Sequence, residues 1–427
     1  MPFSIGNVKI YMEVYGCAAN QGDASIMKGI LLSRGHEIVD EVEKAEVAII
    51  VTCTVIDTTQ QRMLHRINVL KKKVPKLMVA GCMASAQPDL VRKAAGDAIL
   101  LPPKYIHHVE DALNNMPHVF RDAPKTGFPR KFDLKMNIPI SDGCLYNCSY
   151  CITKRARGQL ISYPMEELVE DVKRALRNGS MEIRLTAQDT ASYIHNGNNL
   201  ADLIREVSSI DGRFRIRVGM MHPLSAIKIL DELLEAYENE KVYKFLHLPL
   251  QSASPRILKA MRRGYDIDMF REIVKEFRKK FHDFTLATDI IVAFPGESDD
   301  DFEMSLNAIE EIKPDVVNIT RFSPRPGTDA WKMKRMDTKV AKERSRIMAE
   351  VANKISMERN RRKIGKEYEV LILEKYKGSY VGKTDSYTSV FVDRAEIGKF
   401  FKVRILDAST THLHGILTEK IVEPILE

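Results

Sequence analysis

The sequence predicts an α/β protein in three folded parts: an open parallel-sheet domain, a partial barrel of six β–α units and a small OB-like β-barrel. The length of 427 residues allows two to four domains with an ample core. Short apolar runs alternate with helical segments over roughly the first 335 residues, as in parallel sheets crossed by helices. The final stretch instead holds five short strands, as in a small barrel.

Residues 1–125 are the first predicted domain. Apolar runs predict buried strands at 9–15, 47–52 and 76–80, and the segments between them predict helices near 20–34, 57–73 and 86–95. A cysteine follows each strand within two residues, at Cys17, Cys53 and Cys82. Because ligands of open parallel sheets gather beyond the carboxyl ends of the strands, this topology could bring the three thiols to one crevice.

A linker with several Pro and Gly residues, 122–131, separates this domain from a second one at 132–335. Helices are predicted there at 164–178, 223–239, 266–281 and 299–313, between six strands at 135–141, 181–187, 214–220, 244–249, 285–294 and 316–322. Repeated β–α units of this length close into a full or partial barrel, and the active site of such a barrel lies at the carboxyl ends of its strands.

The net charge of +7 is concentrated in a predicted helical connector, residues 336–363. Between Lys332 and Lys363 there are twelve Lys or Arg against four Asp or Glu, a local excess of eight positive charges. Such a segment suits a polyanion such as RNA, although a solvated helix face would look the same. Residues 364–427 then predict the small β-barrel, with strands at 368–373, 379–382, 386–392, 400–406 and 412–419.

The composition, 44% hydrophobic and 29% charged, predicts an ordinary globular protein of the cytoplasm. No apolar run reaches the roughly 20 residues that span a bilayer, and the N-terminus lacks the basic and apolar segments of a signal peptide. A membrane partner is therefore not expected. Thiols stay reduced in the cytosol, so disulfides are not expected either. Metal binding is then the leading explanation for grouped cysteines.

All six cysteines fall into two groups of three. The local trio forms a C-x-x-x-C-x-x-C loop after the first barrel strand: Cys144, Cys148 and Cys151. The separated trio is that of the first domain. Iron–sulfur clusters normally take four cysteines, so three thiolates on a four-iron cluster leave one iron open to another ligand. Zinc is the alternative for the local trio, but it prefers four closed ligands, and no fourth Cys or His lies near this loop.

Eight strings resemble those of the radical S-adenosylmethionine superfamily, and more narrowly of its methylthiotransferases: YGCAANQ (15–21), VTCTV (51–55), AGCM (80–83), CLYNCSYCITKRARG (144–158), LTAQDT (185–190), LPLQSAS (248–254), DIIVAFPGE (289–297) and FSPRPGT (322–328). Their order and spacing together are highly specific. The resemblance covers nearly the whole chain and implies an N-terminal cluster domain, a radical barrel and a C-terminal TRAM domain.

The resemblance implies the transfer of a methylthio group. The family's substrates are adenosine 37 of tRNA and, in one branch, a ribosomal-protein aspartate. YGCAAN and LTAQDT look like the archaeal and eukaryotic branch, which acts on N6-threonylcarbamoyladenosine. The isopentenyladenosine branch usually has Gly-Gln-Asn where this chain has Ala187-Gln188-Asp189, which argues against that substrate. An iron–sulfur protein that binds RNA without catalysis is the alternative from another class.

The family mechanism implies two [4Fe–4S] clusters with different roles. The cluster on the local trio would bind S-adenosylmethionine and cleave it reductively, and the resulting radical would remove the C2 hydrogen of the adenine. The cluster on the separated trio would hold an extra sulfur, which a second S-adenosylmethionine methylates before transfer. Substitution of an unactivated aromatic C–H needs a radical from a cofactor. The implied partners are tRNA, an electron-donor protein and a sulfur source.

Further residues after the barrel strands are candidates for binding S-adenosylmethionine: Tyr150, Gln188, Asp189, Gln251, Gly296 and Glu297. The resemblance places an aromatic ring such as Tyr150 against the adenine of the cofactor, and core packing is its plainer alternative. A turn or the start of a helix would equally explain Asp189 and Glu297. Gly296 would permit a close backbone approach to a ligand.

Basic side chains are candidates for holding the substrate. Arg155 and Arg157 directly follow the cysteine loop and could bind a carboxylate or phosphate through paired hydrogen bonds. The densest basic group predicts a contact with the tRNA backbone that weakens as salt rises: Arg359, Arg361, Arg362 and Lys363. A solvated helix face is the alternative for both sets.

Overall fold

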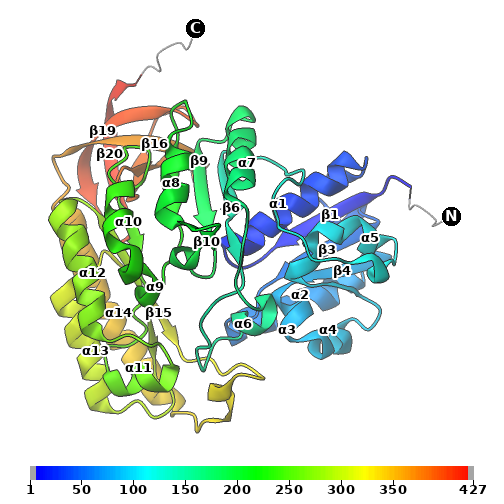
Figure 1. Cartoon of the computed structure of the whole chain (residues 1–427), viewed down its shortest axis with the longest axis horizontal. Coiled ribbons are helices and arrows are strands. Elements are labelled where there is room, and N and C mark those ends of the chain that lie inside the picture. Colours follow the sequence, from blue (N-terminus) through cyan, green and yellow to red (C-terminus); the bar gives the residue numbers. More distant parts are fainter. Residues whose placement is uncertain (1–5, 422–427) are drawn as a thin grey trace. The chain divides into compact units, whose positions relative to one another are not determined.

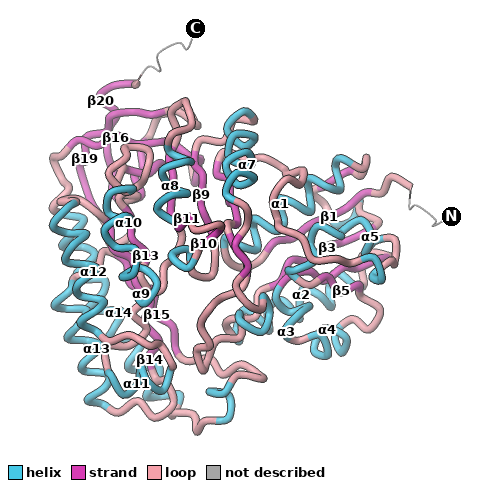
Figure 2. Tube along the Cα trace, in the orientation of Figure 1, coloured by secondary structure: helices cyan, strands magenta, loops and turns pink. Residues whose placement is uncertain are grey.

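The computed structural model describes residues 6–421, and Figure 1 shows how their helices and strands follow one another. The chain divides into two compact units. The first comprises residues 1–178, 186–188 and 323–332, and the second comprises 179–185, 189–322 and 333–427. Figure 2 distinguishes the helices, strands and loops of each unit by colour. All six cysteines belong to the first unit.

A five-stranded parallel sheet forms the core of the first unit, in the order β2-β1-β3-β4-β5. The central strand β3 is buried along its whole length, because helices cover both faces of the sheet. The strands are β1 (Lys9–Val14), β2 (Glu37–Val39), β3 (Val47–Thr52), β4 (Lys76–Gly81) and β5 (Ile99–Leu101). One face packs on α1 (Ala18–Ser33) and α5 (Val109–Leu113), and the other on α2 (Asp57–Lys71) and α4 (Pro88–Ala94).

The three longer strands and the three helices predicted for this domain are confirmed. The prediction missed β2 and β5, because runs of three residues carry no readable periodicity. A five-residue helix, α3 (Cys82–Ala86), also follows β4 without a gap. Cys82 is therefore the first residue of a helix at the carboxyl edge of the sheet.

The rest of the first unit carries the cysteine loop. Its elements are β6 (Lys135–Pro139), β7 (Ser141–Asp142), α6 (Thr153–Arg157), β8 (Ile161–Ser162) and α7 (Met165–Arg177). Gly143 joins β7 to the loop with a φ of +77°, and a Cβ atom there would lie 1.9 Å from the carbonyl oxygen of Gln159. Only glycine fits this turn, so the sharp entry into the cysteine loop depends on it.

Parallel strands and intervening helices build the first part of the second unit. Strand β9 pairs with β12, and β14 lies between β13 and β15. The strands are β9 (Glu182–Thr186), β12 (Arg215–Val218), β13 (Phe245–His247), β14 (Thr285–Val292) and β15 (Val316–Arg321), with a small hairpin of β10 (Ile194–His195) and β11 (Asn198–Asn199). The helices are α8 (Leu200–Ser208), α11 (Pro255–Met261), α12 (Ile267–Lys280) and α13 (Asp299–Ile312).

One predicted helix of this unit, 223–239, is broken into two. The pieces are α9 (Pro223–Ala226) and α10 (Leu230–Ala236), joined by a short 3-10 turn. The break occurs because Ile229 has φ −124° and ψ 23°, outside the α-helical region. The six predicted strands of the central domain are all present, each within a few residues of its predicted bounds.

The second unit ends in the long helix α14 (Thr338–Arg361) and a closed barrel of the order β16-β17-β18-β20-β19. The barrel strands are β16 (Glu367–Tyr376), β17 (Ser379–Thr384), β18 (Ser389–Val392), β19 (Phe400–Ala408) and β20 (Leu413–Lys420). These elements confirm the predicted α/β fold class with its parallel N-terminal sheet and small C-terminal barrel. Within residues 6–421, no helix has the length and apolar character needed to cross a membrane.

Candidate active site

Asn20, near the start of α1, joins the three strand ends that carry the separated cysteine trio. Its side-chain nitrogen donates to the carbonyl oxygens of Tyr15 (2.8 Å) and Thr52 (3.0 Å), which shortly precede the first two cysteines of the trio. Its side-chain oxygen lies 3.8 Å from Sγ of Cys82. One fully buried amide therefore contacts all three strand ends that carry the separated trio.

The three thiols of the separated trio lie within electrostatic reach of one another. Burial, together with the neighbouring Cys17 and Cys53, raises the pKa of Cys82 to about 12, although Arg157 opposes the rise. Burial also raises the pKa of Cys53, with Cys17 adding to the effect. Cys17 is exposed, Cys53 is half-buried and Cys82 is buried, so the trio opens toward solvent at Cys17.

The local trio lies on a compact loop closed by hydrogen bonds. The N–H of Cys144 donates to the carbonyl oxygen of Gly158 (3.3 Å), and the N–H of Cys151 donates to that of Cys148 (3.1 Å). The ammonium of Lys154 donates to the carbonyl oxygen of Cys144. Burial raises the pKa of Cys151, and the neighbouring Cys148 adds to it. The loop therefore gathers its three thiols just beyond β7.

A buried ion-pair network joins the cysteine loop to α1. Arg157, the last residue of α6, donates to the carboxylates of Asp142 (2.8 Å) and Asp23 (2.7 Å) and to the side-chain oxygen of Asn20 (2.9 Å). Lys125 donates to the same two carboxylates at 2.7 Å each. Burial alone would raise the pKa of Asp142, but Arg157 and Lys125 outweigh it and hold the pKa at about 2. Because Asn20 is shared, both cysteine trios belong to one buried framework.

The cysteines suit iron–sulfur clusters better than single metal ions. None of the six is in a disulfide. Across the described range 6–421, no three His, Cys, Asp or Glu side chains are arranged to hold one metal ion. The thiolates of a four-iron cluster bind different irons, so they do not converge on one point. A trio of thiols at three strand ends joined by a buried amide and a trio on a tight loop both fit this donor chemistry.

The first three predicted cofactor residues along the chain lie in different settings. Tyr150 is half-buried within the loop. The side-chain oxygen of Gln188 is buried and has no hydrogen-bond partner among residues 6–421, so a polar ligand would satisfy it. Asp189 already accepts from the N–H of His222 (2.8 Å) and the hydroxyl of Ser225 (2.6 Å). Burial raises the pKa of Asp189 to about 6, and contact with a cofactor stays a prediction for it.

The other predicted cofactor residues lie in the second unit. Gln251 has a left-handed φ of 67°, and its buried side-chain oxygen has no partner within the described part of the chain. Glu297 is buried and accepts from the N–H of Ala293 (2.7 Å) and from the guanidinium of Arg344 (2.6 Å). Burial raises the pKa of Glu297 despite these partners. Gly296 is exposed with a φ of 83°, a conformation that favours glycine.

The predicted substrate residues divide into exposed and buried groups. Arg155 is exposed and donates to the carbonyl oxygen of Gly327 (3.0 Å), whereas Arg157 is the buried centre of the ion-pair network. In the densest basic group, Arg359 pairs with Asp315, and Lys363 is buried against the hydroxyls of Ser386 and Thr388. Two residues of this group are exposed to solvent: Arg361 and Arg362.

Several residues of the site were not singled out from the sequence: Asn20, Asp23, Lys125, Asp142 and Arg325. Arg325 is buried and donates to Gln60 (2.8 Å), Asp57 (3.0 Å) and the carbonyl oxygen of Thr54 (3.3 Å), which follows the second cysteine of the separated trio. Four of the five lie inside the family strings or within two residues of them, which was the available signal. Lys125 lies in the linker, where nothing in the sequence distinguishes it.

Three family models match the chain, and two of them each contain one of the cysteine trios. The Radical SAM superfamily matches residues 138–309, which contain the local trio. The uncharacterized protein family UPF0004 matches residues 9–101, which contain the separated trio. The TRAM domain matches residues 361–418, which form most of the C-terminal barrel.

Whole-length relatives decide the family. A protein of Methanocaldococcus jannaschii, named "Probable threonylcarbamoyladenosine tRNA methylthiotransferase", is 44% identical over 423 residues, covering 96% of this chain and 97% of the relative. The chain belongs to the threonylcarbamoyladenosine tRNA methylthiotransferase family. A human member, the "Threonylcarbamoyladenosine tRNA methylthiotransferase", is 33% identical and is covered over 74% of its length. The predicted family is thereby confirmed.

Solved structures support the fold of this methylthiotransferase family member. The radical S-adenosylmethionine methyltransferase TsrM from Kitasatospora setae superposes with a TM-score of 0.57 at 14% identity, over 76% of this chain and 77% of that one. At this identity the likeness shows the fold alone. Membership in the radical S-adenosylmethionine superfamily implies S-adenosylmethionine and a [4Fe–4S] cluster as cofactors.

Proposed function

We propose that this protein converts N6-threonylcarbamoyladenosine at position 37 of tRNA to its 2-methylthio derivative, using two [4Fe–4S] clusters. The observation that carries the proposal is the junction of both cysteine trios at Asn20 and Arg157. A radical enzyme with one cluster would need only the local trio. The names of the full-length relatives support this substrate, and the TRAM match supports tRNA as partner.

Each group of side chains has a role in the proposed reaction. The reduced cluster and S-adenosylmethionine, when bound, supply a radical able to remove a hydrogen atom from an aromatic carbon. Cys144, Cys148 and Cys151 would hold one cluster, and the buried side-chain oxygens of Gln188 and of Gln251 are each available to a polar ligand group. The separated trio would hold the second cluster, while Asn20 joins the three strand ends that carry it. An electron-donor protein and a sulfur source complete the reaction.

Product mass analysis tests the substrate. Reconstituted enzyme given threonylcarbamoyl-modified tRNA should exchange one adenine hydrogen for a methylthio group, because the family signature favours this base. Isopentenyl-modified tRNA and a ribosomal protein, offered separately, should stay unmodified. Modification of either one in preference to the first substrate would contradict the proposal. Binding of tRNA without any release of 5′-deoxyadenosine would instead favour a non-catalytic RNA-binding protein.

A charge-reversal experiment tests the tRNA contact at the end of α14. The exposed pair, Arg361→Glu with Arg362→Glu, should weaken tRNA binding at least about tenfold and reduce the salt slope by about 2, one for each lost phosphate contact. Arg359 and Lys363 are left unchanged, since their buried partners would confound the result. The same charge change on α12, Lys275→Glu with Lys279→Glu, is the control and should leave binding unaltered. An equal loss of tRNA affinity in the α14 and α12 variants would refute a local tRNA contact at the end of α14.

A further inference from the structure

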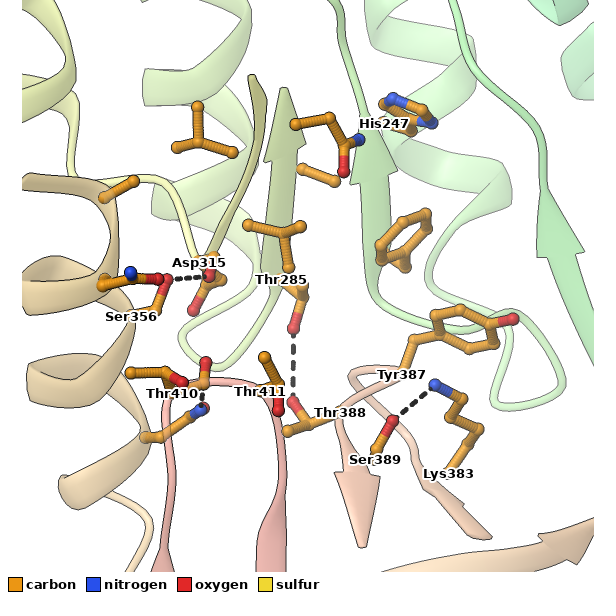
Figure 3. A pocket seen from close by; sticks show the side chains of 18 of the residues that line it. His247, Thr285, Asp315, Ser356, Lys383, Tyr387, Thr388, Ser389, Thr410 and Thr411 are labelled. Atoms are coloured by element: carbon orange, nitrogen blue, oxygen red, sulfur yellow. Dashed lines mark hydrogen bonds between the residues drawn. The ribbon is translucent and has the colours of Figure 1, made fainter. Parts of the chain in front are cut away.

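The second unit contains a cavity of about 360 Å³ that the reaction described above does not use (Figure 3). Its walls come from β13, β14 and β15, from α14 and from the C-terminal barrel. The residues that open these three strands line it: Phe245, Thr285 and Val316. Gln251 and Glu297 follow the opposite, carboxyl ends of the strands. The cavity therefore lies away from the predicted cofactor-binding end, and its volume is within the range of small-molecule sites.

Two cations without ion pairs face this cavity, Arg217 and Lys383. Lys383 donates to the hydroxyl of Ser389 (2.8 Å), and its ammonium lies 4.5 Å from the ring centroid of Tyr387. The guanidinium of Arg217 lies 4.9 Å from the ring of Phe245 and 5.3 Å from that of Tyr387. Neither cation makes an ion pair with any residue of 6–421. Aromatic faces offset part of the cost of burying such cations but supply no counter-charge.

The carboxylates near these two cations are already engaged. The carboxylate of Glu182 interacts electrostatically with Lys383. It already accepts hydrogen bonds from Arg184 (2.5 Å) and from the hydroxyl of Tyr243 (3.0 Å). Burial, together with Arg184 and Arg217, lowers the pKa of Lys383 to about 8, although Glu182 and Glu374 oppose the shift. Glu374, which also acts on Lys383, is exposed. An anion that entered the cavity would therefore relieve an unfavourable concentration of positive charge.

Neutral polar groups and rings line the remainder of the cavity. Figure 3 shows Tyr387, Thr388 and Ser389 from the C-terminal barrel beside Lys383, with Thr410 and Thr411 facing the side of α14. Asp315 also lines this region, but its carboxylate is occupied by Arg359 and by the N–H of Leu286 (2.9 Å). Hydroxyls and side-chain amides beyond the cationic end suit the sugar and base of a small ligand.

We propose that this cavity binds a nucleoside monophosphate, with the phosphate at Arg217 and Lys383 and the nucleoside toward the hydroxyls of the 410–411 turn. Paired cations are the usual recognition groups for a phosphate, and the cavity is larger than the phosphate alone requires. The site is independent of the proposed methylthio transfer, because it shares no residue with the cysteine trios or the candidate cofactor residues.

Equilibrium binding of AMP to the full-length protein tests this assignment. The wild type should bind AMP and unfold at a higher temperature in its presence. Lys383→Met should weaken AMP binding at least tenfold without lowering the melting temperature of the ligand-free protein, because it removes a half-buried cation that makes no ion pair within residues 6–421. Lys377→Met is the matched control: that lysine lies over Tyr376 at 5.4 Å in the same barrel but is exposed, so AMP binding should not change.

Two further probes make the outcome decisive. Adenosine, which lacks the phosphate, should bind at least tenfold more weakly than AMP. Inorganic phosphate should compete with AMP only at much higher concentration, since it does not reach the nucleoside end. The proposal is overturned if AMP fails to bind at millimolar concentration, if Lys383→Met binds it as the wild type does, or if phosphate and AMP bind equally well. Loss of methylthio transfer bears on the proposed function alone and leaves this result unaffected.

Discussion

Replacing the local trio with alanine, Cys144→Ala, Cys148→Ala and Cys151→Ala, should remove about half of the iron and abolish cleavage of S-adenosylmethionine. Two [4Fe–4S] clusters amount to about eight irons per chain after anaerobic reconstitution, so about four should remain. The remaining four would sit on the separated trio, whose framework around Asn20 does not depend on the substituted thiols. Iron analysis and measurement of 5′-deoxyadenosine release check both parts.

The complementary variant supplies the control. Cys17→Ala, Cys53→Ala and Cys82→Ala should also lose about half of the iron, yet still release 5′-deoxyadenosine, because the cofactor-binding trio is intact. Methylthio transfer should be absent from both variants. A fully reconstituted wild type with about four irons would disprove the two-cluster arrangement. Loss of cofactor cleavage in the separated-trio variant would disprove the division of roles.

Arg157→Met should be the most destabilising single substitution in the first unit, at about 3–5 kcal/mol. It removes the cation that compensates the buried carboxylates of Asp23 and Asp142 and leaves Lys125 alone between them. It also removes the guanidinium that donates to the side-chain oxygen of Asn20. The first transition in chemical unfolding should therefore move to markedly lower denaturant, and iron on the separated trio should fall with it.

Two further variants test whether the stability depends on the buried network and on the shape of the Arg157 side chain. Arg155→Met, two residues earlier, removes one exposed hydrogen bond to a carbonyl and should change stability by no more than about 0.5 kcal/mol. Arg157→Lys keeps the charge but cannot reach both carboxylates and Asn20 together, so stability should recover only in part. Equal stability of Arg157→Met and Arg155→Met would mean that the buried network contributes little to holding the unit together.

Much of the architecture could be predicted because strand and helix periodicities are local. The buried run of β3 and the alternation of strands and helices were sufficient to place the parallel sheet. The spacing of the local trio was sufficient to indicate a cluster loop. The edge strands of three residues were not predicted, because they are shorter than the alternation patterns that reveal strands. The break before α10 was not predicted either, since one non-helical residue leaves the apolar pattern of the sequence unchanged.

The direction in which polar side chains face could not be predicted in the same way. Arg157 and Lys363 both stand in basic stretches that look solvent-exposed in the sequence, yet both are buried. Arg157 turns inward because Asp23, 134 positions away, lies opposite it. Lys363 turns inward because hydroxyls of the C-terminal barrel receive it. Partners so distant along the chain cannot be identified from the local composition of the sequence.

The sequence by itself determined the order of the folded parts, the division of six cysteines into two trios and the family, because these depend on spacing along the chain. Only the tertiary structure decided that Asn20 joins three strand ends, that Arg157 links that junction to the cysteine loop, and that Arg217 and Lys383 share a cavity. Burial and charge compensation depend on which distant residues meet, and chain folding alone brings them together.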